Sequence, residues 1–312
     1  MKLKDKLLNH STPVILFEVV PPPAGKPDSM KSLIADVRNI KDLADGINLP
    51  EIHDEDRGAP RTHQFVQRVE PRILAAGILR EIETEIVVNR CVVYETEQAN
   101  WCRETRDNFG LETVVLVGGE SSQTCYPGPS VTAAAEQIRA AQLPISLGGI
   151  TIPSRLGEAE RIRHKHAAGI DFFTTQVLFD SNDIVALIQR LNGLDARIFL
   201  SFAPVSHPRD LEILRWLGVD IPVHLDRFLL HGEPSGAEES ALAAGTSFQR
   251  SLNLAQRILM DVFDNLPPDP PALGLNVEHI NRRNFASAVQ MLEQLGNLYS
   301  SLVAARARAS QT

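Results

Sequence analysis

Glu18 has the setting in this sequence that most clearly suggests chemistry. It lies near the end of the apolar run 14–20, and Pro21 and Pro22 end that run because neither can donate to a sheet ladder. A carboxylate in so apolar a stretch is costly to bury without a partner or a function. Glu18 is therefore either half-exposed and paired with a surface lysine, or held at the carboxyl end of a barrel strand, where catalytic groups lie.

Other polar side chains follow the later apolar runs. If these runs are parallel strands of one barrel, their carboxyl ends meet at one mouth. The polar residues at those ends are Asn48, Asn89 or Arg90, Glu120, Thr151, Gln176, Ser201 or Ser206, Asn276 and Glu278. Carboxylates and amides without a histidine-rich set suit proton transfer to a small organic molecule. We expect Glu120 to assist Glu18 in catalysis, and Asn48 and Glu278 to bind substrate.

The pair Gly118-Gly119 directly follows the predicted fourth strand. Paired glycines let a backbone approach a flat ligand or a phosphate, and their amides can donate, which is the cofactor-binding interpretation. The pair matches neither a dinucleotide fingerprint nor a P-loop, so a tight turn is the alternative.

Two charged runs could each be either a ligand-binding site or a solvated surface. Residues 161–166, which include His164 and Lys165, form a basic cluster that is either a solvated helix face or a site for the phosphates of an anionic cofactor. Residues 53–56 hold one histidine and three acidic residues. Adjacent positions seldom converge on one ion, so we expect a solvated loop there and no metal site.

The elements that must position these residues alternate between strand and helix. Eight strands are predicted, at residues 14–20, 44–49, 85–91, 112–117, 144–150, 171–179, 197–203 and 273–279. Each is followed by a helical pattern, such as 62–79 after the second strand, and 221–267 adds irregular helix before the last strand. Nothing marks a linker. The chain is predicted to be one α/β domain, residues 1–312, folded as a (β/α)8 TIM barrel with extra helices between strands seven and eight.

Composition narrows the class of partner. The formal net charge of −8 argues against nucleic acid or an anionic membrane surface, which both need clustered lysine and arginine. Three cysteines without a CxxC spacing fit reduced thiols, and no apolar run approaches the length of a membrane span. A cytoplasmic protein with a small-molecule ligand is the expectation.

Taken together, these segments resemble the methylenetetrahydrofolate reductase family over about residues 14–300. Residues 17–22 (Phe-Glu-Val-Val-Pro-Pro) are similar to its Phe-Glu-Phe-Phe-Pro-Pro at the end of the first strand. Residues 175–180 (Thr-Gln-Val-Leu-Phe-Asp) are similar to its Thr-Gln-Phe-Phe-Phe-Asp. Residues 203–206 (Ala-Pro-Val-Ser) and 280–282 (Ile-Asn-Arg) resemble its Met-Pro-Val-Ser/Thr and Leu-Asn-Arg.

The resemblance implies an eight-stranded α/β barrel that reduces 5,10-methylenetetrahydrofolate to 5-methyltetrahydrofolate with hydride from NAD(P)H, through FAD. Glu18 would be the general acid that protonates N10, and Gln176 would bind the folate. Burial among apolar neighbours raises the pKa of a carboxyl group, as this role requires. Lys165 matches a family residue that contacts the FAD phosphates, and His164 stands where that helix has arginine.

The sequence also departs from the family. Residues 118–120 (Gly-Gly-Glu) replace its Arg-Gly-Asp, and residues 150–153 (Ile-Thr-Ile-Pro) replace a flavin-contacting Tyr-Pro-Glu-x-His-Pro. Either FAD is held differently, or hydride passes directly from NAD(P)H to the folate, or the substrate has changed. The alternatives are a folate-dependent methyltransferase or corrinoid partner on the same barrel, and a non-catalytic subunit. The chain could assemble as a homo-oligomer or with a partner reductase subunit.

Overall fold

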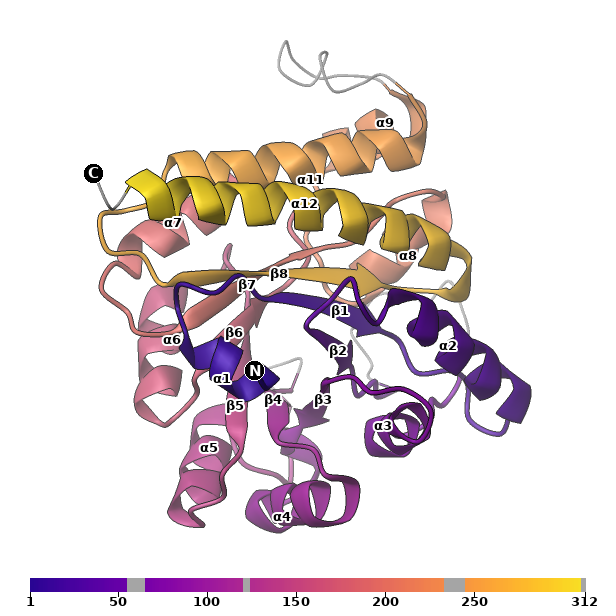
Figure 1. Cartoon of the computed structure of the whole chain (residues 1–312), viewed down its shortest axis with the longest axis vertical. Coiled ribbons are helices and arrows are strands. Elements are labelled where there is room, and N and C mark those ends of the chain that lie inside the picture. Colours follow the sequence, from indigo (N-terminus) through magenta and orange to yellow (C-terminus); the bar gives the residue numbers. More distant parts are fainter. Residues whose placement is uncertain (55–64, 120–123, 233–244, 310–312) are drawn as a thin grey trace.

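Eight parallel strands close into a barrel in the order β1-β2-β3-β4-β5-β6-β7-β8. The structure, a computed structural model, describes residues 1–54, 65–119, 124–232 and 245–309. Helices surround the strands, and the final helix α12 lies along β8 and beside α11 (Figure 1). The predicted (β/α)8 TIM barrel is therefore confirmed.

The strands are short, as expected for a barrel wall. Their bounds are β1 (Ile15–Val19), β2 (Gly46–Leu49), β3 (Ile86–Cys91), β4 (Thr113–Val117), β5 (Ser146–Thr151), β6 (Phe172–Thr175), β7 (Arg197–Phe202) and β8 (Ala272–His279).

The helices follow the strands in alternation. Their bounds are α1 (Leu3–Leu8), α2 (Pro27–Ile40), α3 (Pro71–Leu79), α4 (Gln98–Phe109), α5 (Val131–Ala140), α6 (Glu158–Ala167), α7 (Asn182–Arg190), α8 (Pro208–Trp216), α9 (Val223–His231), α11 (Ser247–Asp264) and α12 (Phe285–Ala309). The extra helices predicted between strands seven and eight are confirmed by α9 and α11, which follow α8. Among the described residues, no helix is both long and apolar enough to cross a membrane.

Two predicted elements were too long. The predicted strand 171–179 ends at Thr175, and Val177 and Phe179 beyond it pack in a separate cluster with α8 and α9. The predicted helix 62–79 begins only at Pro71, where proline occupies the first turn and Glu70 accepts a hydrogen bond from the amide of Arg72. A proline fits the first helical turn but disfavours helix in the residue before it, so the helix cannot extend further toward the N-terminus.

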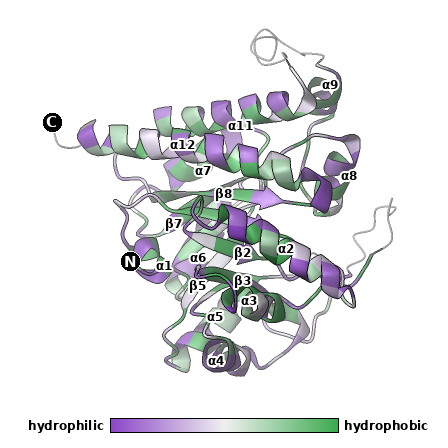
Figure 2. Ribbon diagram, turned by 45° about the vertical axis from the view of Figure 1, so that its right-hand side comes forward, coloured by the Kyte–Doolittle hydropathy of each residue, from purple (hydrophilic) through white to green (hydrophobic). Residues whose placement is uncertain are grey.

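The barrel interior is filled in layers by alternate residues of each strand. At the end where the strands begin, Leu3 and Leu7 of α1 pack into an apolar cluster with Leu16 and close that end. In the middle, Phe172 and Phe199 meet edge to face, with their ring centroids 5.8 Å apart. Figure 2 shows the strands as largely hydrophobic, with hydrophilic residues at the arrowhead of β8. Strand β8 is therefore hydrophilic mainly at its carboxyl end.

Arg197 fastens α1 to the base of the barrel. Its side chain is buried, and its guanidinium donates to the carbonyls of Leu7 (3.3 Å), Lys6 (3.1 Å) and Asn9 (2.7 Å), and to that of Leu273 in β8 (2.5 Å). The last carbonyls of a helix need such donors because no later turn supplies them. One buried cation thus satisfies the end of α1 and joins it to the wall.

We expect Arg197→Met to lower the free energy of unfolding by roughly 3 kcal/mol, since four hydrogen bonds are lost and each contributes about 1 kcal/mol. Urea denaturation followed by circular dichroism measures this. The matched control is Arg163→Met, because exposed Arg163 donates to the carbonyl of Arg190, the last residue of α7, at 2.8 Å. It should change stability by no more than about 0.5 kcal/mol. Equal, small effects in both variants would show that Arg197 does not fasten the helix.

Candidate functional site

Three polar side chains lie side by side where β2, β1 and β8 end. Glu18 is in register with Asn48 of β2 and with Glu278 of β8. Residues in register on neighbouring parallel strands project from the same face of the sheet. Leu16, two residues before Glu18, belongs to the interior cluster, so this face is the inside of the barrel. The strand pairing therefore places Glu18, Asn48 and Glu278 together at the mouth.

Hydrogen bonds connect these side chains to each other and to β7. Asn48 Nδ2 donates to Glu18 Oε2 at 2.7 Å. Asn276 Nδ2 donates to Ser201 Oγ at 3.0 Å and to Glu278 Oε1 at 3.3 Å. Each carboxylate thus receives an amide donor from a neutral residue. Among the described residues, no lysine or arginine forms an ion pair with either, so the pairing of Glu18 with a surface lysine, one sequence-based alternative, is not found there.

The electrostatic setting favours the neutral acid. Burial raises the pKa of Glu18 well above its usual value, and the charge of Glu278 raises it further, while the hydrogen bond from Asn48 partly offsets both effects. Burial also raises the pKa of Glu278, to about 7, against a lowering effect of Ser201. Two neighbouring carboxyl groups titrate as a pair, because the charge on one disfavours charge on the other. The setting therefore favours one neutral carboxyl group over two charged ones.

Three amide oxygens at this mouth have no hydrogen-bond partner in the structure. They are the buried Oδ1 atoms of Asn48, Asn89 and Asn276. Asn89 lies two residues after the interior residue Val87, so it faces inward like the other two. A buried acceptor without a donor is costly. The mouth is therefore suited to a ligand that presents several N–H groups.

Gln176 lies apart from these contacts. It follows β6 directly, and its Nε2 donates to the carbonyl of Leu217 at 3.4 Å. It also lines a hollow of about 170 Å³ together with Pro153, Asp180 and Asp220. This hollow lies beyond the end of β6, whereas the acid pair lies at β1 and β8. The predicted folate-binding role of Gln176 stays a prediction.

The predicted cofactor residues have varied settings. Gly119 must lack a side chain, because a Cβ there would lie 2.3 Å from the ring of Tyr126, and Gly118 has no comparable crowding. This packing explains why Gly119 is a glycine, and the cofactor-binding role of Gly118 and Gly119 stays a prediction. Glu120, predicted to assist catalysis, lies outside the described residues.

In the basic cluster on α6, Lys165 contacts the barrel and His164 faces solvent. Lys165 is partly buried, and its Nζ donates to the carbonyl of Ile150 in β5 at 2.8 Å, while burial lowers its pKa. His164 is exposed. The role of both residues in cofactor binding stays a prediction.

Comparisons with known proteins give a structural match only. No protein-family model matches the chain, and no curated protein does. The chain is similar to an uncharacterized protein from Clostridium thermocellum, described as binding two copies of 5-methyl-5,6,7,8-tetrahydrofolic acid. The TM-score is 0.71 at 18% identity, over 95% of this chain and 99% of that one. A weaker match, to dihydropteroate synthase from Xanthomonas albilineans, has a TM-score of 0.43 at 16% identity, over 92% of each chain, and carries no argument. The first match supports the barrel fold.

We expect Glu18→Gln to stabilise the protein more at alkaline than at acid pH. Because the pKa of Glu18 is raised by folding, the folded state retains a proton that the unfolded chain releases, so stability falls as pH rises above about 4.5 toward the folded pKa. Glutamine cannot ionise and avoids this loss, which predicts a gain of roughly 1–3 kcal/mol near pH 8 that disappears near pH 4. Urea denaturation at both pH values measures the difference.

The control is Glu293→Gln, a substitution of an exposed carboxylate on α12. Its effect on stability should be small and nearly independent of pH. A gain for Glu18→Gln that is no larger at alkaline than at acid pH would mean that Glu18 is ionised in the folded protein like any surface glutamate.

Proposed function

We propose that the protein reduces 5,10-methylenetetrahydrofolate to 5-methyltetrahydrofolate with hydride from NAD(P)H. The observation that carries this proposal is the position of Glu18 in register with Glu278 at the barrel mouth, where burial raises the pKa of both carboxyl groups, because the reaction needs a neutral carboxylic acid. The resemblance of residues 17–22 to the reductase family agrees with it. So does the Clostridium thermocellum protein of the same fold, which is described as binding the product of this reaction.

The unpaired amide oxygens support a folate ligand. A pterin ring presents several N–H groups along one edge, and the Oδ1 atoms of Asn48, Asn89 and Asn276 offer buried acceptors at the mouth. Hydrogen bonds made by a substrate to such groups are worth more than those to exposed groups, since the acceptors are otherwise unsatisfied. The position of Asn48 and Glu278 beside Glu18 supports their assignment to substrate binding.

Glu18 supplies the proton in this reaction. Its carboxyl group donates to N10, and the bond from N10 to the bridging methylene carbon breaks, leaving its electron pair on N10. The carbon is then an iminium on N5, and hydride from the nicotinamide converts it to a methyl group. Glu18 is left as a carboxylate beside Glu278, and the repulsion between the two charges favours its reprotonation.

FAD fits the described residues only in part. Lys165 Nζ is hydrogen-bonded to Ile150, His164 is exposed, and Tyr126 fills the space in front of Gly119. These residues do not form a binding site for a flavin, and the reaction steps above do not use FAD. Direct transfer of hydride from NAD(P)H to the folate accounts for the same product, and assays with and without added FAD separate the two routes.

We expect Glu18→Gln to slow the reduction by about 10²–10⁴-fold, which is the usual contribution of a general acid. The dissociation constant for 5-methyltetrahydrofolate should stay within a few-fold of wild type, because glutamine keeps the size and the hydrogen bond with Asn48. Oxidation of NAD(P)H in the presence of 5,10-methylenetetrahydrofolate measures the rate, and Glu293→Gln is the control. Turnover within a few-fold of wild type would remove Glu18 from the mechanism.

If wild-type protein oxidises neither NADH nor NADPH in the presence of 5,10-methylenetetrahydrofolate, with or without FAD, the proposed reductase activity is wrong. Binding of 5-methyltetrahydrofolate in the same sample would then favour the folate-dependent methyltransferase or the corrinoid partner, which use the folate but no nicotinamide.

We expect Gln176→Ala to weaken folate binding by about tenfold, which is the equivalent of roughly one hydrogen bond. The same variant should lower kcat by a much smaller factor. A group that binds ground state and transition state equally changes KM and leaves kcat nearly unchanged. Steady-state kinetics and calorimetric titration with 5-methyltetrahydrofolate measure both effects. Gln189→Ala is the control, since this exposed amide only contacts the carbonyl of Asn265. An unchanged dissociation constant in Gln176→Ala would exclude Gln176 from the folate site.

A further inference from the structure

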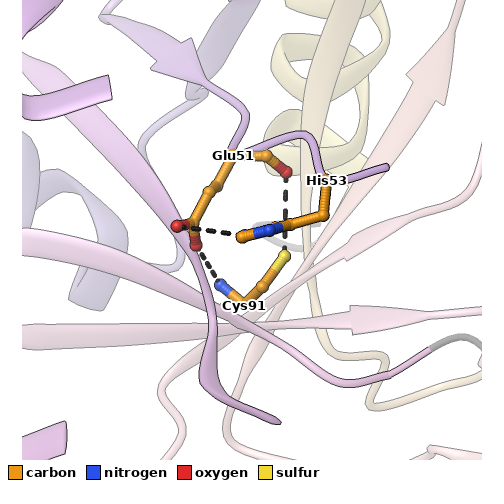
Figure 3. A group of neighbouring side chains, drawn as sticks. All are labelled: Glu51, His53 and Cys91. Atoms are coloured by element: carbon orange, nitrogen blue, oxygen red, sulfur yellow. Dashed lines mark hydrogen bonds and ion pairs between the residues drawn. The ribbon is translucent and has the colours of Figure 1, made fainter. Parts of the chain in front are cut away.

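Three side chains with metal-ligating atoms meet beside the barrel mouth. They are Glu51 and His53, just after β2, and Cys91, the last residue of β3 (Figure 3). One carboxylate oxygen, one imidazole nitrogen and the thiol sulfur all lie within 4.8 Å of one another. Among the described residues the group has these three members, and none of them has a part in the proposed reduction.

The strand order explains why distant residues converge here. β2 and β3 are neighbours, and Pro50 ends β2, so the chain turns across the end of β3. Glu51 then lies against Cys91: its Oε2 accepts a hydrogen bond from the Cys91 amide, and its carbonyl accepts one from Cys91 Sγ at 3.7 Å. Cys91 lies two residues after the inward-facing Asn89, so its side chain is directed toward the mouth.

The spacing of the ligand atoms fits a tetrahedral ion. His53 Nε2 contacts Glu51 Oε1 at 3.2 Å, and this buried nitrogen has no other partner among the described residues. Nitrogen and oxygen ligands about 2.0–2.1 Å from a zinc ion are separated by about 3.3 Å along the edge of a tetrahedron. Two of the three donors therefore already have the separation that a zinc ion requires, with an imidazole nitrogen that lacks another partner.

Surrounding contacts hold the ligands in place. Glu51 Oε1 also accepts from Arg90 Nη1 at 3.3 Å, and the His53 ring stacks on Tyr94 with centroids 4.2 Å apart. Such outer contacts orient the ligands of metal sites. The positive charge of Arg90 is balanced by Glu95, 2.7 Å from its other terminal nitrogen, so it does not by itself exclude a cation.

We propose that Glu51, His53 and Cys91 bind one zinc ion, with a fourth coordination position left open. One sulfur, one nitrogen and one oxygen donor favour zinc over magnesium or calcium, which prefer oxygen ligands alone. Three protein ligands and an exchangeable fourth are the pattern of zinc sites that bind water or a substrate. The side chains of Glu51 and His53 stay 15% and 32% exposed, which leaves the ion a path from solvent. Binding releases the thiol proton of Cys91 to solvent.

The test is titration of metal-free, full-length protein with zinc chloride by calorimetry and with cobalt chloride by absorption spectroscopy. We expect one ion per chain and a near-ultraviolet charge-transfer band from thiolate to cobalt. Cys91→Ser should abolish this band and weaken zinc binding at least tenfold. His53→Gln, which replaces a partly exposed side chain, should weaken zinc binding while retaining a weaker band.

The matched control is Cys125→Ser, which removes an exposed free thiol and should leave both signals unchanged. Circular dichroism shows whether each variant keeps the fold, and His53→Gln keeps the test decisive if Cys91→Ser fails to fold. Absence of stoichiometric zinc binding, a band that persists in Cys91→Ser, or a band lost in Cys125→Ser would overturn the proposal. None of these outcomes depends on reductase activity.

Discussion

Two carboxyl groups side by side, Glu18 on β1 and Glu278 on β8, are the constraint on which the rest of the site depends. They lie on the strands that close the barrel, in direct register, so the β1–β8 ladder fixes the separation of their backbones. Ionising both in a buried setting would be costly, and no described lysine or arginine compensates either charge. The lowest-cost state has one of the two carboxyl groups neutral, with the amides of Asn48 and Asn276 donating to the pair. A proton held in this way is available to a bound substrate.

Burying polar groups at the mouth costs free energy, and packing elsewhere in the barrel must offset this cost. The layers beneath the acid pair are apolar, and the aromatic rings of Phe172 and Phe199 occupy the space in front of Gly148 and Gly274. Below them, α1 closes the opposite end and Arg197 ties it to the wall. These layers keep water from reaching the mouth through the barrel, and the low dielectric they create is what raises the pKa of Glu18.

The strands and the position of Glu18 could be predicted from the sequence, because a strand shows as a local run of apolar residues. The run before Pro21 marks the end of β1, and register then follows from barrel closure, which brings Glu278 to Glu18. The length of β6 could not be predicted, since Val177 and Phe179 are as apolar as a strand but pack against α8 and α9. The start of α3 was missed although Pro71 marks it. The cluster of Glu51 and Cys91 has no signal in the sequence, since strand pairing alone brings together residues so far apart.

The protonation state of Glu18 at neutral pH tests this account most directly. Infrared difference spectroscopy of wild-type protein against Glu18→Gln at pH 7, in the absence of substrate, separates a carboxylic acid from a carboxylate by its carbonyl stretching band. The account predicts a carboxylic acid band assigned to Glu18. The band should weaken in Glu278→Gln, because loss of the neighbouring charge lowers the pKa of Glu18. Carboxylate bands alone for Glu18 at pH 7 would contradict the account.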